Sequence, residues 1–325
     1  MPSSDGASLA GHQVSLSFHH RLLTDPARMR AYYRAILDEI RPTDVVLDLG
    51  TGSGVLALWA AQAGARHVYA VEPHGVIEVA RRLAAANGLA DRITFVHADL
   101  RHLTPADLGS PIDLLLSEPM GNFFVTDCMQ PVLRHARGFL RDGARTLPRS
   151  IALELAATTQ PLPQIDFWAG RLGALRLDAA LPLALQEACF THLAPHELVT
   201  APQFVATFAL VEAPSIVDGR VGLTVTRPGI MTAIAGWFRA DLGHGHVLST
   251  GPSDATATHW GQLVLPVAAV AVEVGDLIEA AVRVDQIDAT LPRNAFAWEV
   301  VVRRGAAVVA EFRGDTEWLY PRGRS

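Results

Sequence analysis

The stretch VVLDLGTGSG at residues 45–54 decides the fold of this chain. A short, mainly apolar run passes directly into a turn that contains three glycines, and an alanine-rich apolar segment follows at residues 55–65. Short apolar runs are typical of strands buried on both faces, and glycines permit a tight turn that a ligand can approach closely. The stretch therefore predicts a parallel strand, a ligand-binding turn and a helix.

The same alternation of strand and helix continues on both sides of this stretch. Alternating elements with short links predict a parallel sheet that is covered by helices on both faces. We therefore expect an α/β, Rossmann-like domain over residues 1–148. Its further elements are expected as helices at residues 26–40 and 76–89, and as strands at residues 67–72, 93–99 and 112–118.

The composition changes after about residue 148. Short segments with alternating or β-rich composition follow one another, separated by turn residues, and this pattern is typical of a β-sandwich or β-barrel. We expect such a second domain over residues 149–325, with a partly helical insert at about residues 163–196. The expected strands lie at residues 150–159, 203–212, 219–229, 262–275, 277–287, 295–305 and 306–314.

Charge and cysteine content exclude several classes of protein. The formal net charge is −6 with no basic run, which argues against a nucleic-acid-binding protein. The two cysteines, Cys128 and Cys189, fit neither a metal site nor a disulfide scaffold, so a reducing cytoplasm is the expected location. No signal peptide and no apolar run of about 18 to 20 residues is found, so we expect no membrane segment.

Three acidic positions at successive strand ends sharpen the ligand prediction. Asp48 precedes the glycine turn, Glu72 ends the next strand, and Asp99 ends the strand after that. At these places Glu72 can accept hydrogen bonds from both hydroxyls of a ribose, and Asp99 can meet an adenine amino group. Enzymes that bind NAD share the first two signals, but their glycine spacing is G-x-G-x-x-G. Here the spacing is G-x-G-x-G, through the glycines Gly50, Gly52 and Gly54.

That spacing after an aspartate resembles class I methyltransferases, which implies S-adenosylmethionine as cofactor and S-adenosylhomocysteine as product. The loop SEPMGNFFVTDCM at residues 117–129 narrows the resemblance to the protein arginine N-methyltransferase family, which carries two acids in this loop. Glu118 stands at the first acid and Asp127 at the second. Met129 would wall the methyl-transfer site or would pack in the core.

Two further stretches resemble the same family. Thr258, His259 and Trp260 match its THW loop, which contributes to the substrate side. The segment HHRLLTDPARMRAYY at residues 19–33 matches the helix before the first strand. By this resemblance His19 and Arg28 bind the cofactor, with Arg28 on the methionine carboxylate. Asp25 pairs with His259, and this pair would carry a proton away or would tie the domains together.

The resemblance implies a Rossmann-like domain, a β-barrel and a helical dimerisation arm at about residues 163–196. That insert carries the apolar residues Phe167, Trp168, Leu172 and Leu175 with little core of its own. An isologous homodimer in which each arm covers the partner is therefore expected. The alternative is a helical hairpin that folds back on its own barrel.

The chemistry implied for the two acids suits a guanidinium. This group is planar, stays protonated and donates five N–H bonds, so two carboxylates can clamp it through charge-assisted pairs. The clamp turns one nitrogen towards the methyl group, and catalysis is then mostly positioning. Glu118, Asp127, His259 and Asp25 are the expected catalytic residues, with Trp260 beside the substrate; no metal is expected.

The chain departs from the family pattern on the substrate side. Residues 9–13, LAGHQ, replace a Y-F-x-x-Y helix, Asp127 is one methylene shorter than glutamate, and Asn122 replaces an aromatic residue. We therefore expect a bacterial member of the family that methylates free arginine or an arginine-derived metabolite. The alternatives are a protein arginine, another small nitrogen or oxygen nucleophile, and a catalytically silent dimer that binds the cofactor.

Overall fold

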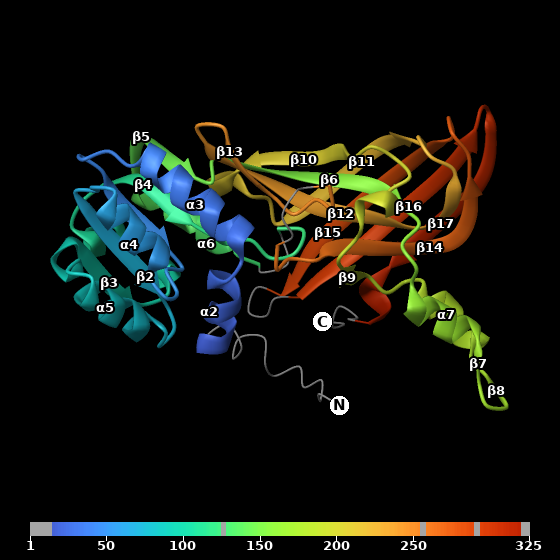
Figure 1. Cartoon of the computed structure of the whole chain (residues 1–325), viewed down its shortest axis with the longest axis horizontal. Coiled ribbons are helices and arrows are strands. Elements are labelled where there is room, and N and C mark those ends of the chain that lie inside the picture. The colour runs from blue at the N-terminus through green and yellow to red at the C-terminus, as the bar shows by residue number, and fades with distance from the viewer. Residues whose placement is uncertain (1–14, 125–127, 254–257, 289–292, 320–325) are drawn as a thin grey trace.

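The first half of the chain is a parallel sheet. The computed structural model describes residues 15–124, 128–253, 258–288 and 293–319. All neighbouring strands of the first sheet run parallel, in the order β3-β2-β1-β4-β5 (Figure 1). This confirms the expected Rossmann-like architecture. The strands are β1 (Val45–Leu49), β2 (His67–Glu72), β3 (Ile93–His97), β4 (Ile112–Ser117) and β5 (Leu140–Leu147).

Helices accompany this sheet, and two of them begin at a residue whose side chain caps the first turn. Ser15 caps α2 by accepting the amide of Phe18, and Asp25 caps α3, which has a proline in its first turn. None of the described helices is both long enough and apolar enough to cross a bilayer. The helices are α2 (Leu16–Leu23), α3 (Pro26–Glu39), α4 (Val55–Gln62), α5 (Ile77–Ala86) and α6 (Gln130–Ala136).

The second half forms two antiparallel sheets, as the β-rich pattern predicted. The indole of Trp298 crosses between the sheets and donates to the carbonyl of Pro266 at 2.9 Å. One sheet contains β6 (Ser150–Thr158), β9 (Cys189–Thr191), β10 (Gln203–Ala209), β12 (Gly229–Gly243), β13 (His246–Ser249) and β14 (Gln262–Val272). The other contains β11 (Ile216–Thr224), β15 (Leu277–Asp288), β16 (Arg293–Arg304) and β17 (Ala307–Asp315).

The strand β12 is absent from the sequence-based expectation, although it pairs with β6 and β14 in the middle of its sheet. Six consecutive residues in it are buried, so its sequence does not alternate as an exposed strand would. Gly236 in this strand has no room for a side chain, because Phe123 and Leu155 lie within 3 Å of a Cβ placed there. The loop after β4 therefore packs directly on the second domain.

The expected arm projects away from the body of the molecule (Figure 1). It is less helical than predicted, because a β-hairpin of two strands, each two residues long, separates its short helices. Large apolar side chains on it are exposed, among them Phe167 at 49%, Leu172 at 59% and Leu175 at 66%. The elements are α7 (Pro163–Ala169), β7 (Arg171–Leu172), β8 (Leu175–Arg176) and α8 (Leu181–Ala184).

A buried carboxylate joins α3 to the second domain. The Glu39 side chain is 1% exposed and pairs with Arg145, Arg149 and His244. Arg149 precedes β6, and His244 lies in the turn between β12 and β13. Burial raises the pKa of Glu39, but the hydrogen bonds from Arg149 and Arg145 outweigh it, so the pKa lies below its ordinary value. The ionised form of Glu39 therefore stabilises the folded chain.

We expect Glu39→Gln to lower the free energy of unfolding by about 3 kcal/mol, the low end for breaking a buried ion pair, because Asp44 still holds Arg145. Since the folded pKa of Glu39 lies below the unfolded one, its contribution is present above the ordinary glutamate pKa and is lost as the pH falls through the folded value. Urea unfolding at neutral pH measures the first effect, and a series of unfolding curves taken down through the folded pKa of Glu39, below the ordinary glutamate value, measures the second.

The matched control is Asp218→Asn, which removes a surface ion pair with Arg283 outside the arm and should leave the unfolding midpoint nearly unchanged. Equal stability of the Glu39→Gln and control variants would contradict a stabilising role for the buried cluster.

Candidate active site

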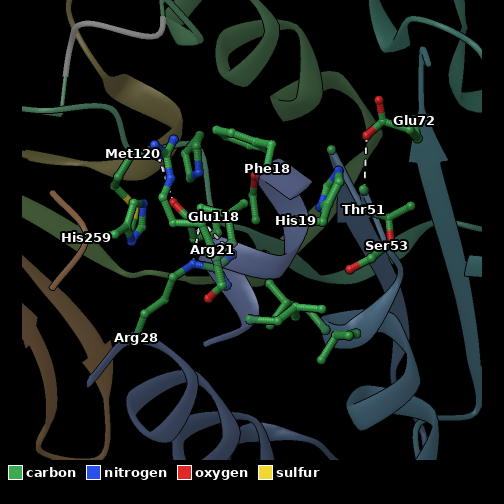
Figure 2. Close-up of a pocket in the computed structure, with 18 of the residues that line it drawn as sticks. Phe18, His19, Arg21, Arg28, Thr51, Ser53, Glu72, Glu118, Met120 and His259 are labelled. Atoms are coloured by element: carbon green, nitrogen blue, oxygen red, sulfur yellow. Dashed lines mark hydrogen bonds and ion pairs between the residues drawn. The ribbon is translucent and has the colours of Figure 1, made fainter. Parts of the chain in front are cut away.

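One cavity of about 800 Å³ lies where the carboxyl ends of β1 and β4 meet α2 and the THW loop. In the strand order β3-β2-β1-β4-β5, successive strands are added on one side of β1 up to β3 and on the other side from β4 onward. Open α/β sheets bind their ligands at such a switch point in the strand order, here between β1 and β4. Figure 2 shows two groups of lining residues: His19, Thr51, Ser53 and Glu72 at one end, and Arg21, Arg28, Glu118, Met120 and His259 at the other. No cluster that could hold a metal ion is found among the described residues.

The glycine turn and Glu72 form the first end of the cavity. Glu72 Oε2 accepts the amide of Gly52 at 3.0 Å, and Oε1 accepts the amide of His74 at 3.1 Å. Burial raises the pKa of Glu72 above its ordinary value, although these two hydrogen bonds act to lower it. Gly50 has φ +72° and open space where a side chain would stand. The Glu72 carboxylate can accept hydrogen bonds from a ribose, and the glycine backbone beside it leaves space for the rest of a nucleoside ligand.

Two of the predicted cofactor residues, Asp48 and Gly54, do not line the cavity but stabilise the conformation of this turn. The carboxylate of Asp48 accepts the Thr51 hydroxyl at 2.5 Å, and burial raises the pKa of Asp48 to about 7. Gly54 has φ +84°, and a Cβ there would lie 2.5 Å from the Cβ of Ala80 in α5. Both residues therefore hold the turn in the shape that brings Gly50 and Gly52 to the cavity.

Asp99 lies outside the residues that line the cavity. The strand β3 ends at His97, two residues before it, and Asp99 caps a short 3₁₀ helix. Its carboxylate lies 2.6 Å from Arg101 Nη2 and also accepts the Arg101 amide, which lowers its pKa. The adenine contact predicted for Asp99 stays a prediction, and the geometry gives it no support.

The second end of the cavity is built around Glu118 and Arg28. Glu118 Oε2 accepts Arg28 Nε at 2.8 Å and lies 2.7 Å from Arg28 Nη2, while Oε1 accepts the amide of Met120 at 3.1 Å. Arg28 Nη1 donates to the carbonyl of Leu22 and to the sulfur of Met29. Glu118 thus grips the guanidinium of Arg28, and each residue retains capacity for one further hydrogen bond.

The loop that carries Glu118 is held in an unusual backbone conformation. Phe123 and Phe124 have φ of +50° and +58°, and Cys128 has φ +54°. Such conformations cost free energy in residues with a side chain, and they cluster at functional sites. Met129 and Asn122 line the cavity, and Met129 also packs against the hydrophobic core, so its predicted place at the methyl-transfer site stays a prediction. The predicted second acid, Asp127, lies outside the described residues.

The THW loop closes the cavity from the second domain. The backbone N and the Nδ1 of His259 each lie 2.8 Å from Asp25 Oδ2, while Asp25 Oδ1 accepts the amide of Arg28. Burial raises the pKa of Asp25, but these hydrogen bonds outweigh it, and the pKa lies below its ordinary value. Trp260 Nε1 donates to the carbonyl of Met120 at 2.7 Å. The predicted pair is present and ties the two domains at the cavity.

Sequence reasoning missed Tyr32, which holds the start of the acidic loop through a hydrogen bond. This fully buried residue donates its hydroxyl to the carbonyl of Ser117, and the Ser117 hydroxyl donates to the carbonyl of Leu49. The spacing of Asp25, Arg28 and Tyr32 places all three on one face of α3, and that spacing is a signal that the sequence offered.

We expect Gly52→Ala to weaken binding of S-adenosylhomocysteine at least tenfold, as measured by calorimetry. The new Cβ would lie 2.6 Å from a ring carbon of His19 in a backbone with φ +54°, so the turn and His19 cannot both stay in place. Gly88→Ala is the control, because Gly88 has φ +68° but no atom near its Cβ position and does not line the cavity. Comparable loss of binding in the control would contradict the assignment of Gly52.

Comparisons with known proteins agree with this geometry. Residues 46–143 match a family model described as a methyltransferase domain, and residues 155–295 match the arginine methyltransferase oligomerization subdomain. The chain is 30% identical over 259 residues to protein arginine N-methyltransferase 1 of Chlamydomonas reinhardtii, which covers 76% of this chain and 74% of that protein. It is also 30% identical over 287 residues to an arginine N(omega)-methyltransferase of Streptomyces achromogenes subsp. streptozoticus, with 84% and 77% covered.

Solved structures share the fold. Protein arginine methyltransferase 10 of Arabidopsis thaliana matches with a TM-score of 0.80 at 23% identity, and 93% of this chain and 98% of that chain are covered. The PRMT1 enzyme-prozyme complex of Trypanosoma brucei with AdoHcy matches with a TM-score of 0.83 at 22% identity and the same coverage. The expected architecture, a Rossmann-like domain followed by a domain of antiparallel β-sheets, is thereby confirmed. The chain belongs to the protein arginine N-methyltransferase family and is an S-adenosylmethionine-dependent methyltransferase.

Proposed function

We propose that this enzyme transfers a methyl group to a guanidine nitrogen of free arginine or of an arginine-derived metabolite. One observation carries the proposal: the Glu118 carboxylate, which is 9% exposed at the cavity wall, is bound to the guanidinium of Arg28. The carboxylate therefore already binds one guanidinium, and it retains capacity for one hydrogen bond from a second guanidinium. The name of the Streptomyces relative, an arginine N(omega)-methyltransferase, supports the small acceptor.

The residues of the first end would hold the cofactor. Gly50 and Gly52 would leave room for its chain, Glu72 would accept the ribose hydroxyls, and His19 would pack beside the turn. The remaining N–H of Arg28 would reach the methionine carboxylate. When bound, S-adenosylmethionine supplies a methyl group on a positively charged sulfur, which is already a good leaving group.

The residues of the second end would orient the acceptor. Glu118, with Asp127 as the proposed second acid, would hold two edges of the flat cation and leave one nitrogen turned to the methyl group. His259 Nδ1 faces Asp25, so Nε2 is the atom that would accept the proton released as the N–C bond forms. Met129 and Trp260 would limit the space around that nitrogen.

A protein arginine is the second candidate acceptor, and the match to the Chlamydomonas protein arginine N-methyltransferase 1 favours it. Two sequence departures argue for the small acceptor: residues 9–13 lack the family's tyrosines, and Asp127 replaces glutamate. Both positions lie outside the described residues. Radiolabelled S-adenosylmethionine with free arginine in one reaction and an arginine-rich peptide in another separates the two candidates.

We expect Glu118→Gln to reduce kcat with free arginine at least a hundredfold, because the amide cannot stabilise the acceptor's positive charge. Methyl transfer is measured by mass spectrometry of the product, which also distinguishes guanidine methylation from methylation of another nitrogen or oxygen. Glu78→Gln, at an exposed ion pair on α5, is the matched control and should retain full activity. An active Glu118→Gln variant would contradict the proposed grip.

We also propose that the chain is a homodimer joined through its arm and that it works in the cytoplasm. Within each chain, residues 1–148 would bind the cofactor, and residues 149–325 would complete the substrate site. The exposed apolar side chains Phe167, Leu172 and Leu175 support the dimer, because such side chains on a projecting segment mark an interface. The match of residues 155–295 to an oligomerization subdomain points the same way.

We expect the double variant Leu172→Glu and Leu175→Glu to elute as a monomer in size-exclusion chromatography with light scattering, because two buried charges would oppose association. The control places glutamate at Val308 and Val309, which are also exposed but lie on β17 in the second domain. A monomeric wild-type chain, or a dimer that survives the arm variant, would contradict the proposal.

A further inference from the structure

Most charged groups that line the cavity already have partners. Arg28 is bound to Glu118, and Glu72 accepts two backbone amides. His259 is held by Asp25. Arg21 differs from all of these: it lines the same cavity, and no acidic side chain pairs with it among the described residues.

Arg21 lies at the acceptor end of the cavity. It belongs to the last turn of α2, and the carbonyl of the next residue, Leu22, accepts Arg28 Nη1 at 3.3 Å. This contact fixes the end of α2 beside the Arg28–Glu118 pair. In Figure 2, Arg21 is drawn with Glu118 and His259, away from Glu72 and Ser53.

The local environment of Arg21 holds it in place without neutralising it. The carbon of its guanidinium lies 5.2 Å from the ring centre of Phe18, one helical turn earlier, which also lines the cavity. An aromatic face orients a guanidinium, but it leaves the N–H groups at the rim free to donate. Arg21 is exposed, so an incoming ligand can reach it.

We infer that Arg21 binds the α-carboxylate of the acceptor and thereby selects a free amino acid over an arginine within a protein. The inference rests on the proposed function, because it places the guanidine of that acceptor at Glu118. A free α-carboxylate would form a charge-assisted, two-bond pair with the planar Arg21 guanidinium. An arginine inside a polypeptide has a neutral amide there, and a cationic arginine-rich peptide would be repelled by the unpaired charge.

The structural alternative is that Arg21 only complements the C-terminal end of the α2 dipole. In that case its replacement would change helix stability and would not change the choice among acceptors. A test therefore needs acceptors that share the guanidine and differ in the carboxylate. Arginine, argininamide and agmatine form such a series, since argininamide has a neutral amide and agmatine has no carboxyl group.

The experiment measures KM and kcat for the three acceptors with the wild-type enzyme and with Arg21→Gln. We expect the wild-type KM for arginine to be roughly tenfold to a hundredfold lower than for argininamide or agmatine, the range for loss of one charge-assisted bond. Arg21→Gln should abolish this difference by raising the KM for arginine alone, with little change in kcat. Arg34→Gln, an exposed arginine on α3 outside the cavity, is the control and should retain the wild-type preference.

Calorimetric titration of S-adenosylhomocysteine into each variant separates the acceptor from the cofactor. Equal cofactor affinity in the wild type and Arg21→Gln supports the inference, and a weakened affinity in Arg21→Gln overturns it, because Arg21 would then serve the cofactor carboxylate. Equal use of arginine and argininamide by the wild type overturns it while leaving guanidine methylation intact. If the wild-type enzyme methylates none of the three acceptors and no arginine-rich peptide, the proposed function itself is overturned.

Discussion

The ion pair between Arg28 and Glu118 joins α3 to the loop after β4 at the second end of the cavity. Glu118 comes from the loop after β4, and Arg28 comes from α3, ninety residues earlier in the chain. Their pairing offsets the burial of two charged groups, because an isolated charge in such a largely buried place would carry a large cost in free energy. We expect a guanidinium or carboxylate that enters this end of the cavity to share the hydrogen bonds of this pair.

The helix α3 supports this pair and also joins the domains. Asp25 at its start holds the THW loop through His259, and Glu39 at its end holds Arg149 and His244. Both contacts are made by acids that are nearly inaccessible to solvent. The second domain is thus fixed at two points along one rigid helix, and the wall that it contributes to the cavity has a defined position.

The sequence predicts the features that repeat with a simple period or lie at fixed spacing. The parallel sheet, the glycine turn and the place of Glu72 beside it were predicted in this way and are observed. The pairing of Asp25 with His259, which only the resemblance to the family implied, is observed as well. What it could not predict depends on tertiary packing. The strand β12 is buried on both faces and does not alternate, and Asp99 turns to Arg101 because its strand ends two residues early. The positive φ angles in the acidic loop likewise arise from packing against the second domain.

The central claim is that Glu118 holds the guanidinium of the acceptor beside the methyl donor. A crystal structure of the enzyme with S-adenosylhomocysteine and arginine tests it most directly. The account predicts a Glu118 oxygen about 3 Å from a guanidine nitrogen of the bound arginine, with another guanidine nitrogen facing the sulfur. An acceptor bound elsewhere, or a Glu118 side chain that contacts only Arg28 in that complex, would contradict it.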